Sequence, residues 1–81
     1  MATGNARRLG ELGMNIPLAK ELAAQITAGT GNARKLSELA MVPALAKEVA
    51  TQISGTKSRT RLVELGMAPG LAVEVVAQMN S

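Results

Sequence analysis

The chain of 81 residues has no Cys, His, Trp, Tyr, Phe or Asp. Without Cys it forms no disulfide, and without Cys or His it lacks the thiolate and imidazole ligands of many metal and haem sites. The same absence excludes catalysis by a Cys or His nucleophile. The first residues show no charged segment followed by an apolar one, and the apolar runs are only a few residues long. We therefore expect neither a targeting segment nor a membrane span.

The residues that are present are typical of a small folded domain with a mildly basic surface. Hydrophobic residues make up 47% of the chain and charged residues 19%, which favours a globular over a disordered protein. Nine Lys and Arg residues against six Glu give a net charge of +3. A nucleic-acid-binding domain of this size commonly carries a larger and more clustered basic excess.

Three copies of one sequence unit make up the chain. A shift of 27 aligns residues 3–27 with 30–54 and matches 16 of 25 positions, and a shift of 26 aligns 30–54 with 56–80 and matches 11. The chain is thus a single domain, 1–81, of three repeats that span 3–29, 30–55 and 56–81. The third copy departs most from the others. Terminal repeats commonly differ because one of their faces has no neighbour, so we interpret this drift as a solvent-facing end.

Each repeat has the pattern of two short helices joined by a tight turn. The expected N-caps of the first helix are three aligned polar residues, Asn5, Asn32 and Ser58. The expected first turn of the second helix is marked by a proline in every copy, at Pro17, Pro43 and Pro69. Apolar residues recur on one face of each helix, and the predicted core consists of Leu9, Leu12, Leu18, Leu22, Ile26 and their counterparts.

This pattern predicts an all-α fold in which three tandem αα-hairpins form a compact six-helix array. Helices this short are unstable alone in water, so the hairpins must bury their apolar faces against one another or against a partner. We expect each second helix to begin at its proline. Pro17 stands one place later in its copy than Pro43 and Pro69 do. The first copy is therefore expected to have a longer turn and a longer linker.

The six Glu residues occupy only two positions of the repeat, at 11, 38 and 64 and at 21, 48 and 74. They could form a cation site, but helix surface is the favoured interpretation, because Arg7 and Arg34 stand four residues before Glu11 and Glu38. General acid–base catalysis needs paired groups with different pKa values, and this pattern offers none. We therefore expect no enzyme, no cofactor, no metal and no small-molecule substrate.

Two sets of polar residues are candidate contacts to a partner. The first set is Gln25, Gln52 and Gln78, which could instead bond to the next repeat or lie in solvent. The second set is Arg7, Arg8, Arg34, Lys35, Arg59 and Arg61, which stand near the starts of the first helices. Interleaved Glu and the lack of aromatics favour a solvated face over phosphate binding. Cations at a helix start oppose its dipole, however, which favours an anionic neighbour.

The turn of each hairpin carries a methionine, at Met14, Met41 and Met67, which is expected to pack in the core.

Leu12-Gly13-Met14 resembles the corner of ubiquitin-associated domains and is similar to the turn of helix-hairpin-helix DNA-binding motifs. The former domains have a third helix and usually an aromatic residue at the corner, and the latter prefer two glycines. This resemblance implies the alternative function of a small basic nucleic-acid-binding or adaptor module.

The whole repeat, Gly-Asn-Ala-Arg-x-Leu-x-Glu-Leu-Gly-Met-x-Pro-x-Leu-Ala-x-Glu-Val-Ala-x-Gln-Ile, resembles helical segments of small head-fibre or decoration-type proteins of tailed bacteriophages. It covers Gly4–Ile26, Gly31–Ile53 and, with more differences, Lys57–Met79. The resemblance implies a non-enzymatic structural protein that docks on a larger protein lattice. Its implied partner is a larger virion protein. The three near-identical repeats also favour a homo-oligomer. Nucleic acid stays a less favoured partner, and no membrane partner is expected. Its implied location is the virion, after synthesis in the host cytoplasm, or otherwise the cytoplasm.

Overall fold

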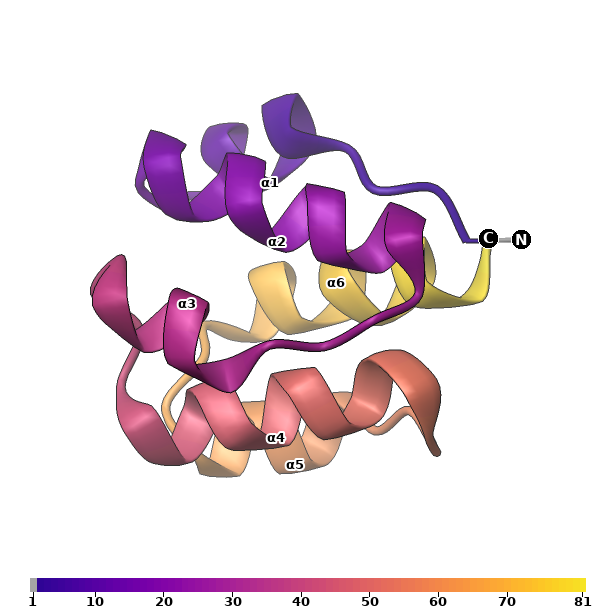
Figure 1. Cartoon of the computed structure of the whole chain (residues 1–81). Helices are drawn as coiled ribbons and strands as arrows, with labels where there is room; N and C mark the ends of the chain where they lie inside the picture. The colour runs from indigo at the N-terminus through magenta and orange to yellow at the C-terminus, as the bar shows by residue number, and fades with distance from the viewer. Residues whose placement is uncertain (1) are drawn as a thin grey trace.

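The computed structural model describes residues 2–81, which form helices and no strand (Figure 1). The helices of this described part are α1 (Ala6–Glu11), α2 (Ile16–Ala28), α3 (Ala33–Glu38), α4 (Pro43–Ser54), α5 (Arg59–Glu64) and α6 (Pro69–Asn80). Each repeat contributes one short and one long helix, which pack together as a hairpin. The predicted all-α array of three αα-hairpins is therefore confirmed.

The first helix of every repeat begins at the predicted capping residue. The side chain of Asn5 accepts a hydrogen bond from the Arg8 amide, and Asn32 and Ser58 do the same for the amides of Lys35 and Arg61. These bonds satisfy first-turn amides that have no acceptor within the helix.

The second helices begin at one common repeat position, which holds Ile16, Pro43 or Pro69. The expectation that α2 begins at Pro17 is wrong, because proline fits either of the first two helical positions, whose amides lack an intrahelical acceptor. The turns that precede α2, α4 and α6 are equally long, and so are the linkers. The extra residue of the first copy lies inside α2, which has 13 residues where α4 and α6 have 12.

A residue with a left-handed backbone follows the first helix in each hairpin. Gly13 and Gly66 have φ angles of 109° and 111°, which glycine adopts without a steric penalty. Ala40 holds the same position in the second repeat with φ at 91°. An alanine in this region costs about 1 kcal/mol relative to glycine, so the turn geometry is imposed by the surrounding fold.

The three hairpins close into a ring. Helix α2 packs on α3, α4 packs on α5, and α6 packs back on α1. In Figure 1 the hairpin turns lie at the left of the view, while Ser81 at the right lies beside Thr3, near the start of the described chain. Because α6 covers α1, the third repeat is not the solvent-facing end that its sequence drift suggested.

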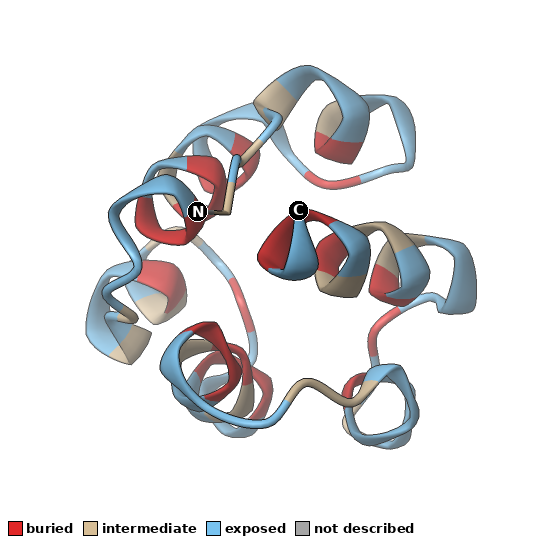
Figure 2. Ribbon diagram, turned by 90° about the vertical axis from the view of Figure 1, so that its right-hand side faces the viewer, coloured by how far each residue is buried: buried red, intermediate tan, exposed pale blue. Residues whose placement is uncertain are grey.

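The core lies between the hairpins and consists of equivalent residues from each repeat. Leu9, Leu36 and Leu62 are fully buried, and the three turn methionines are also buried, as predicted. Figure 2 shows the buried faces of the helices turned toward the inside of the ring. Leu12 was expected in the core but is 38% exposed. Leu12 is the C-cap of α1, and its counterparts Leu39 and Leu65 cap α3 and α5 but are partly buried against the core.

Candidate functional site

A buried glutamine joins each repeat to the next. Gln52 is fully buried, and its Nε2 donates to Glu48 Oε2 at 2.8 Å and to the Ser58 carbonyl oxygen at 3.1 Å. Its Oε1 accepts from the Ser58 amide at 2.9 Å. One amide side chain thus satisfies both backbone groups of the residue that caps the next helix.

The same arrangement occurs at the two other junctions. Gln25 bonds to both backbone groups of Asn32, and Gln78 bonds to both backbone groups of Asn5, which is 73 residues away in the chain. The Thr3 amide adds a bond of 2.9 Å to Ser81 Oγ at this closing junction. The glutamines therefore bond to the next repeat, which is the first of the alternatives to partner contact that the sequence left open.

Charged residues reinforce two of these junctions. Arg61 lies 3.4 Å from Glu48, and Arg8 lies 3.4 Å from Glu74 at the closing junction. The hydrogen bond from Gln52, together with the Arg61 guanidinium, holds the pKa of Glu48 below its ordinary value. This lowering outweighs the opposing effect of burial on the carboxylate. The Glu48 carboxylate therefore stays charged at this junction, where Gln52 and Arg61 contact it.

The remaining predicted basic residues lie on the outside. The expected pairs are confirmed, with Arg7 at 3.4 Å from Glu11 and Arg34 at 3.5 Å from Glu38. Lys35 and Arg59 are exposed and make no ion pair within residues 2–81. The six basic residues stand on or beside α1, α3 and α5, which α2, α4 and α6 separate around the ring. They therefore do not gather into one basic patch.

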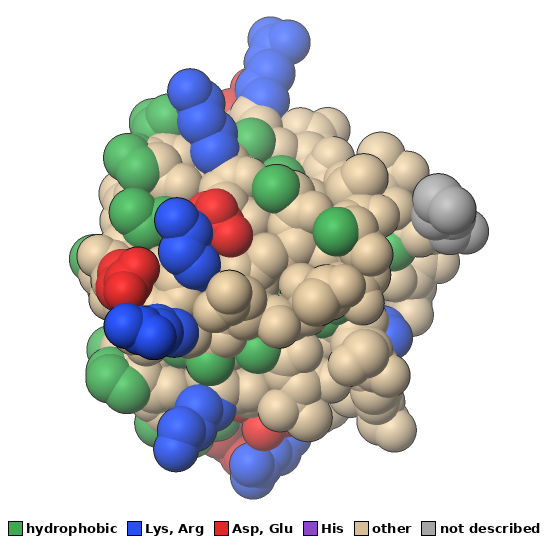
Figure 3. Space-filling view, viewed as in Figure 1, with side chains coloured by type: hydrophobic (Ala, Val, Ile, Leu, Met, Phe, Trp, Pro, Cys, Tyr) green, Lys and Arg blue, Asp and Glu red, His purple; other side chains and the backbone are tan. Residues whose placement is uncertain are grey.

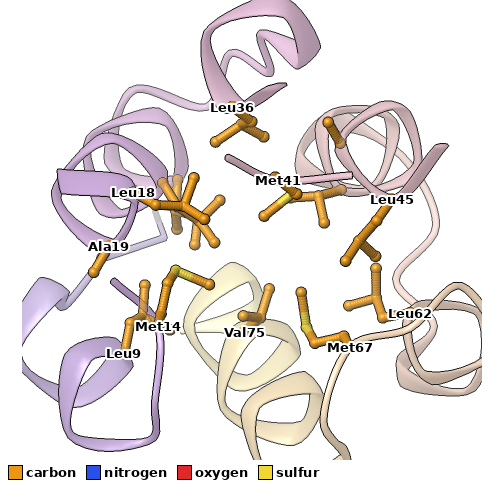
Figure 4. Packing of buried hydrophobic residues seen from close by; sticks show 14 of the residues in the cluster. Leu9, Met14, Leu18, Ala19, Leu36, Met41, Leu45, Leu62, Met67 and Val75 are labelled. Carbon is orange, nitrogen blue, oxygen red and sulfur yellow. The ribbon is translucent and has the colours of Figure 1, made fainter. Parts of the chain in front are cut away.

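The three hairpin turns surround a shallow depression of about 260 Å³. It is lined by four repeat positions, each contributed by all three repeats: Gly13, Ala40 and Gly66; Met14, Met41 and Met67; Asn15, Val42 and Ala68; and Leu18, Leu45 and Leu71. Figure 4 shows the three methionines facing a common centre from three different hairpins. The depression thus lies where the pseudo-threefold symmetry of the repeats converges. We call these twelve residues the corner face.

The corner face carries no charged residue, and neither do the whole turn segments 12–18, 39–45 and 65–71. Its rim includes Val42, which is 59% exposed, while the methionines of its floor are nearly buried. Figure 3 shows apolar side chains along the side of the hairpin turns, at the left, between the charged side chains. Sequence reasoning missed this face, although the lack of charge in three aligned segments was a readable signal.

The described residues hold neither a candidate metal site nor a candidate membrane span. Residues 2–81 contain no group of three or more Asp, Glu, Cys or His side chains arranged to hold a metal ion. Among these same residues, no helix is long and apolar enough to cross a membrane.

Comparisons with protein-family models, with curated proteins and with solved structures found no match to this chain.

Proposed function

We propose that the chain is a non-enzymatic structural protein of a bacteriophage particle, which docks on a larger protein lattice through its corner face. The observation that carries this proposal is the uncharged face formed by the three hairpin turns, with Val42 exposed at its rim. We place the association site on this surface because it is uncharged, partly apolar and open to solvent. The resemblance of the repeat to phage head-fibre and decoration proteins supplies the class of partner.

The symmetry of the corner face supports a lattice as the partner. Its twelve residues present the same four repeat positions three times around one centre. A protein lattice also repeats its surface, so that equivalent contacts form together. Simultaneous contacts of modest strength then give an affinity well above that of a single contact. The nearly buried methionines provide an adaptable floor, because the flexible thioether side chain adjusts to an apolar group that enters.

The ion pairs make nucleic acid the weaker alternative. Arg7, Arg8, Arg34 and Arg61 each lie within 4.0 Å of a Glu side chain, which reduces the positive charge available to phosphates. The chain also has no aromatic residue on which a base could stack. A docking face without charge further predicts binding that changes little with salt, whereas several phosphate contacts make binding fall steeply.

Replacing Val42 by Glu tests the docking proposal. We expect the variant to lose at least about tenfold in its co-sedimentation with purified phage particles that lack this chain, because a buried unpaired carboxylate opposes an apolar interface. Its thermal unfolding should stay close to that of the parent protein, since the side chain is 59% exposed. The measurement is a co-sedimentation titration at low and at high salt.

The matched control is Thr51→Glu, which places the same charge at an exposed position of α4 away from the corner face. This variant should bind particles as the parent does. Failure of the parent protein to sediment with particles would contradict the proposal. Salt-sensitive binding to duplex DNA in the same assay would favour the alternative of a nucleic-acid-binding module.

A further inference from the structure

The third repeat differs from the other two on one outer surface. Thr60 replaces an arginine, Val63 replaces a small residue, and Val73 replaces a lysine. The residues at the equivalent positions of the first and second repeats are Arg7 and Arg34, Gly10 and Ser37, and Lys20 and Lys47. Three changes on neighbouring helices thus remove two positive charges and add two β-branched apolar side chains. The first two repeats serve as an internal reference for what the fold alone requires.

These changes create an apolar groove between α5 and α6. It has a volume of about 360 Å³ and is lined by Arg59, Thr60, Val63, Glu64, Pro69 and Val73. Val63 is 38% exposed and Val73 is 46% exposed. In the first repeat, by contrast, the Ile16 side chain reaches over Gly10 at the equivalent place. The groove shares no residue with the corner face.

Opposite charges stand at the two ends of the groove without a partner in residues 2–81. In the first two repeats the equivalents of Glu64 are paired with Arg7 and Arg34, but Thr60 now stands in place of that arginine. Neither Arg59 nor Glu64 lies within 4.0 Å of an opposite charge among the described side chains. Arg59 itself stands where the other repeats have Ala6 and Ala33.

The groove is complementary to a second copy of itself. Residues 59, 60, 63 and 64 share one face of α5, because residues three and four apart are neighbours on a helix. Arg59 and Glu64 are about 7.5 Å apart along the helix axis. When two α5 helices lie antiparallel, a single register places Arg59 beside Glu64 of the other copy and Thr60 beside its Val63. That register satisfies both charges and covers the apolar centre.

We propose that the α5–α6 groove is a self-association site, at which two copies of this chain form a two-fold symmetric dimer through antiparallel α5 helices. Val73 of each copy extends the apolar contact beside α5. The contact area is small, so the dimer is a weak one with a dissociation constant of about 10 μM to 1 mM. The inference does not depend on the docking role, since the corner face lies outside the groove.

Sedimentation equilibrium of the intact chain tests the dimer. We expect the average mass to rise with concentration from 8.3 kDa toward twice that value. Val73→Lys and Val63→Ser restore residues found in the other repeats, so each variant should fold normally and remain monomeric. Val42→Glu alters the corner face instead and should associate as the parent does. A parent chain that stays monomeric at 1 mM, about the upper end of the expected range, would overturn the proposal.

A charge-exchange experiment tests the antiparallel register itself. Arg59→Glu places two negative charges opposite each other at both ends of the dimer, and Glu64→Arg places two positive charges there. Each variant alone should associate at least about tenfold more weakly than the parent, because facing like charges repel. An equimolar mixture of the two should recover association as a heterodimer. If the mixture stays monomeric, or if Val42→Glu alone abolishes the parent's dimer, the proposed groove is wrong.

Discussion

Replacing Gln78 by Leu is expected to lower the free energy of unfolding by about 3 kcal/mol, as much as the same change at Gln52. Leucine fills most of the space of glutamine, so the loss comes from unsatisfied polar groups rather than from a cavity. The change removes the bonds of the Gln78 side chain to the Asn5 amide, the Asn5 carbonyl and the Glu74 carboxylate. Gln52 makes the same three bonds to Ser58 and Glu48.

Equal losses of stability for Gln78→Leu and Gln52→Leu would distinguish a closed ring from an open array. In an open array Gln78 would have no next repeat to bind, and its replacement by Leu would be nearly neutral. Urea unfolding followed by circular dichroism measures both variants, since the chain has no aromatic residue for fluorescence. Thr51→Ala is the control, because its exposed hydroxyl bonds only to its own helix, at the Lys47 carbonyl. That control should change stability by less than about 0.5 kcal/mol.

Gly31→Ala is expected to destabilise the fold by about 3 kcal/mol, through a steric overlap in the linker before α3. A β-carbon at Gly31 would overlap the carbonyl oxygen of Ala50 in α4, and at Gly4 it would overlap that of Ala23. Both sides of each contact are backbone, so neither yields without moving a helix or a linker. The third repeat has Lys57 at this position and Val76 in place of Ala50. Its linker also begins differently, because Gly55 has φ at −129° where the equivalent Gly29 has 74°.

Gly70→Ala provides the matched control for Gly31→Ala. Gly70 lies in the first turn of α6 with no atom within 4 Å of an added β-carbon, and the equivalent residue of the second repeat is Ala44. Removing a glycine from a helix stabilises it by about 0.5–1 kcal/mol. Thermal unfolding should therefore shift upward for Gly70→Ala and downward for Gly31→Ala. Equal shifts for the two variants would contradict the close approach of linker and helix.

Local features of this fold could be predicted because they depend on neighbouring residues. The caps at Asn5, Asn32 and Ser58 could be predicted because a short polar side chain can accept a hydrogen bond from a first-turn amide of its own helix. The core leucines follow from helical periodicity. Periodicity also placed Leu12 in the core, because it does not distinguish this residue from Leu39 and Leu65, which hold the same C-cap position and are partly buried.

Closure of the ring could not be predicted, because it depends on how far each repeat rotates relative to the last. That rotation is set by packing between helices, and the same repeat pattern fits an open array equally well. The role of the glutamines is hidden for the same reason, since Gln78 finds its partner only when α6 meets α1. The corner face was also missed, although the absence of charge from all three turns was visible.

Amide hydrogen exchange at Asn5 tests ring closure most directly. In the closed ring this amide donates to Gln78 Oε1 at 2.8 Å, just as the amides of Asn32 and Ser58 donate to Gln25 and Gln52 at 2.9 Å. We predict that the three amides exchange at rates within about tenfold of one another, through opening of the whole fold. An Asn5 amide that exchanges as fast as one in an unfolded chain, beside protected amides at Asn32 and Ser58, would contradict the closed ring.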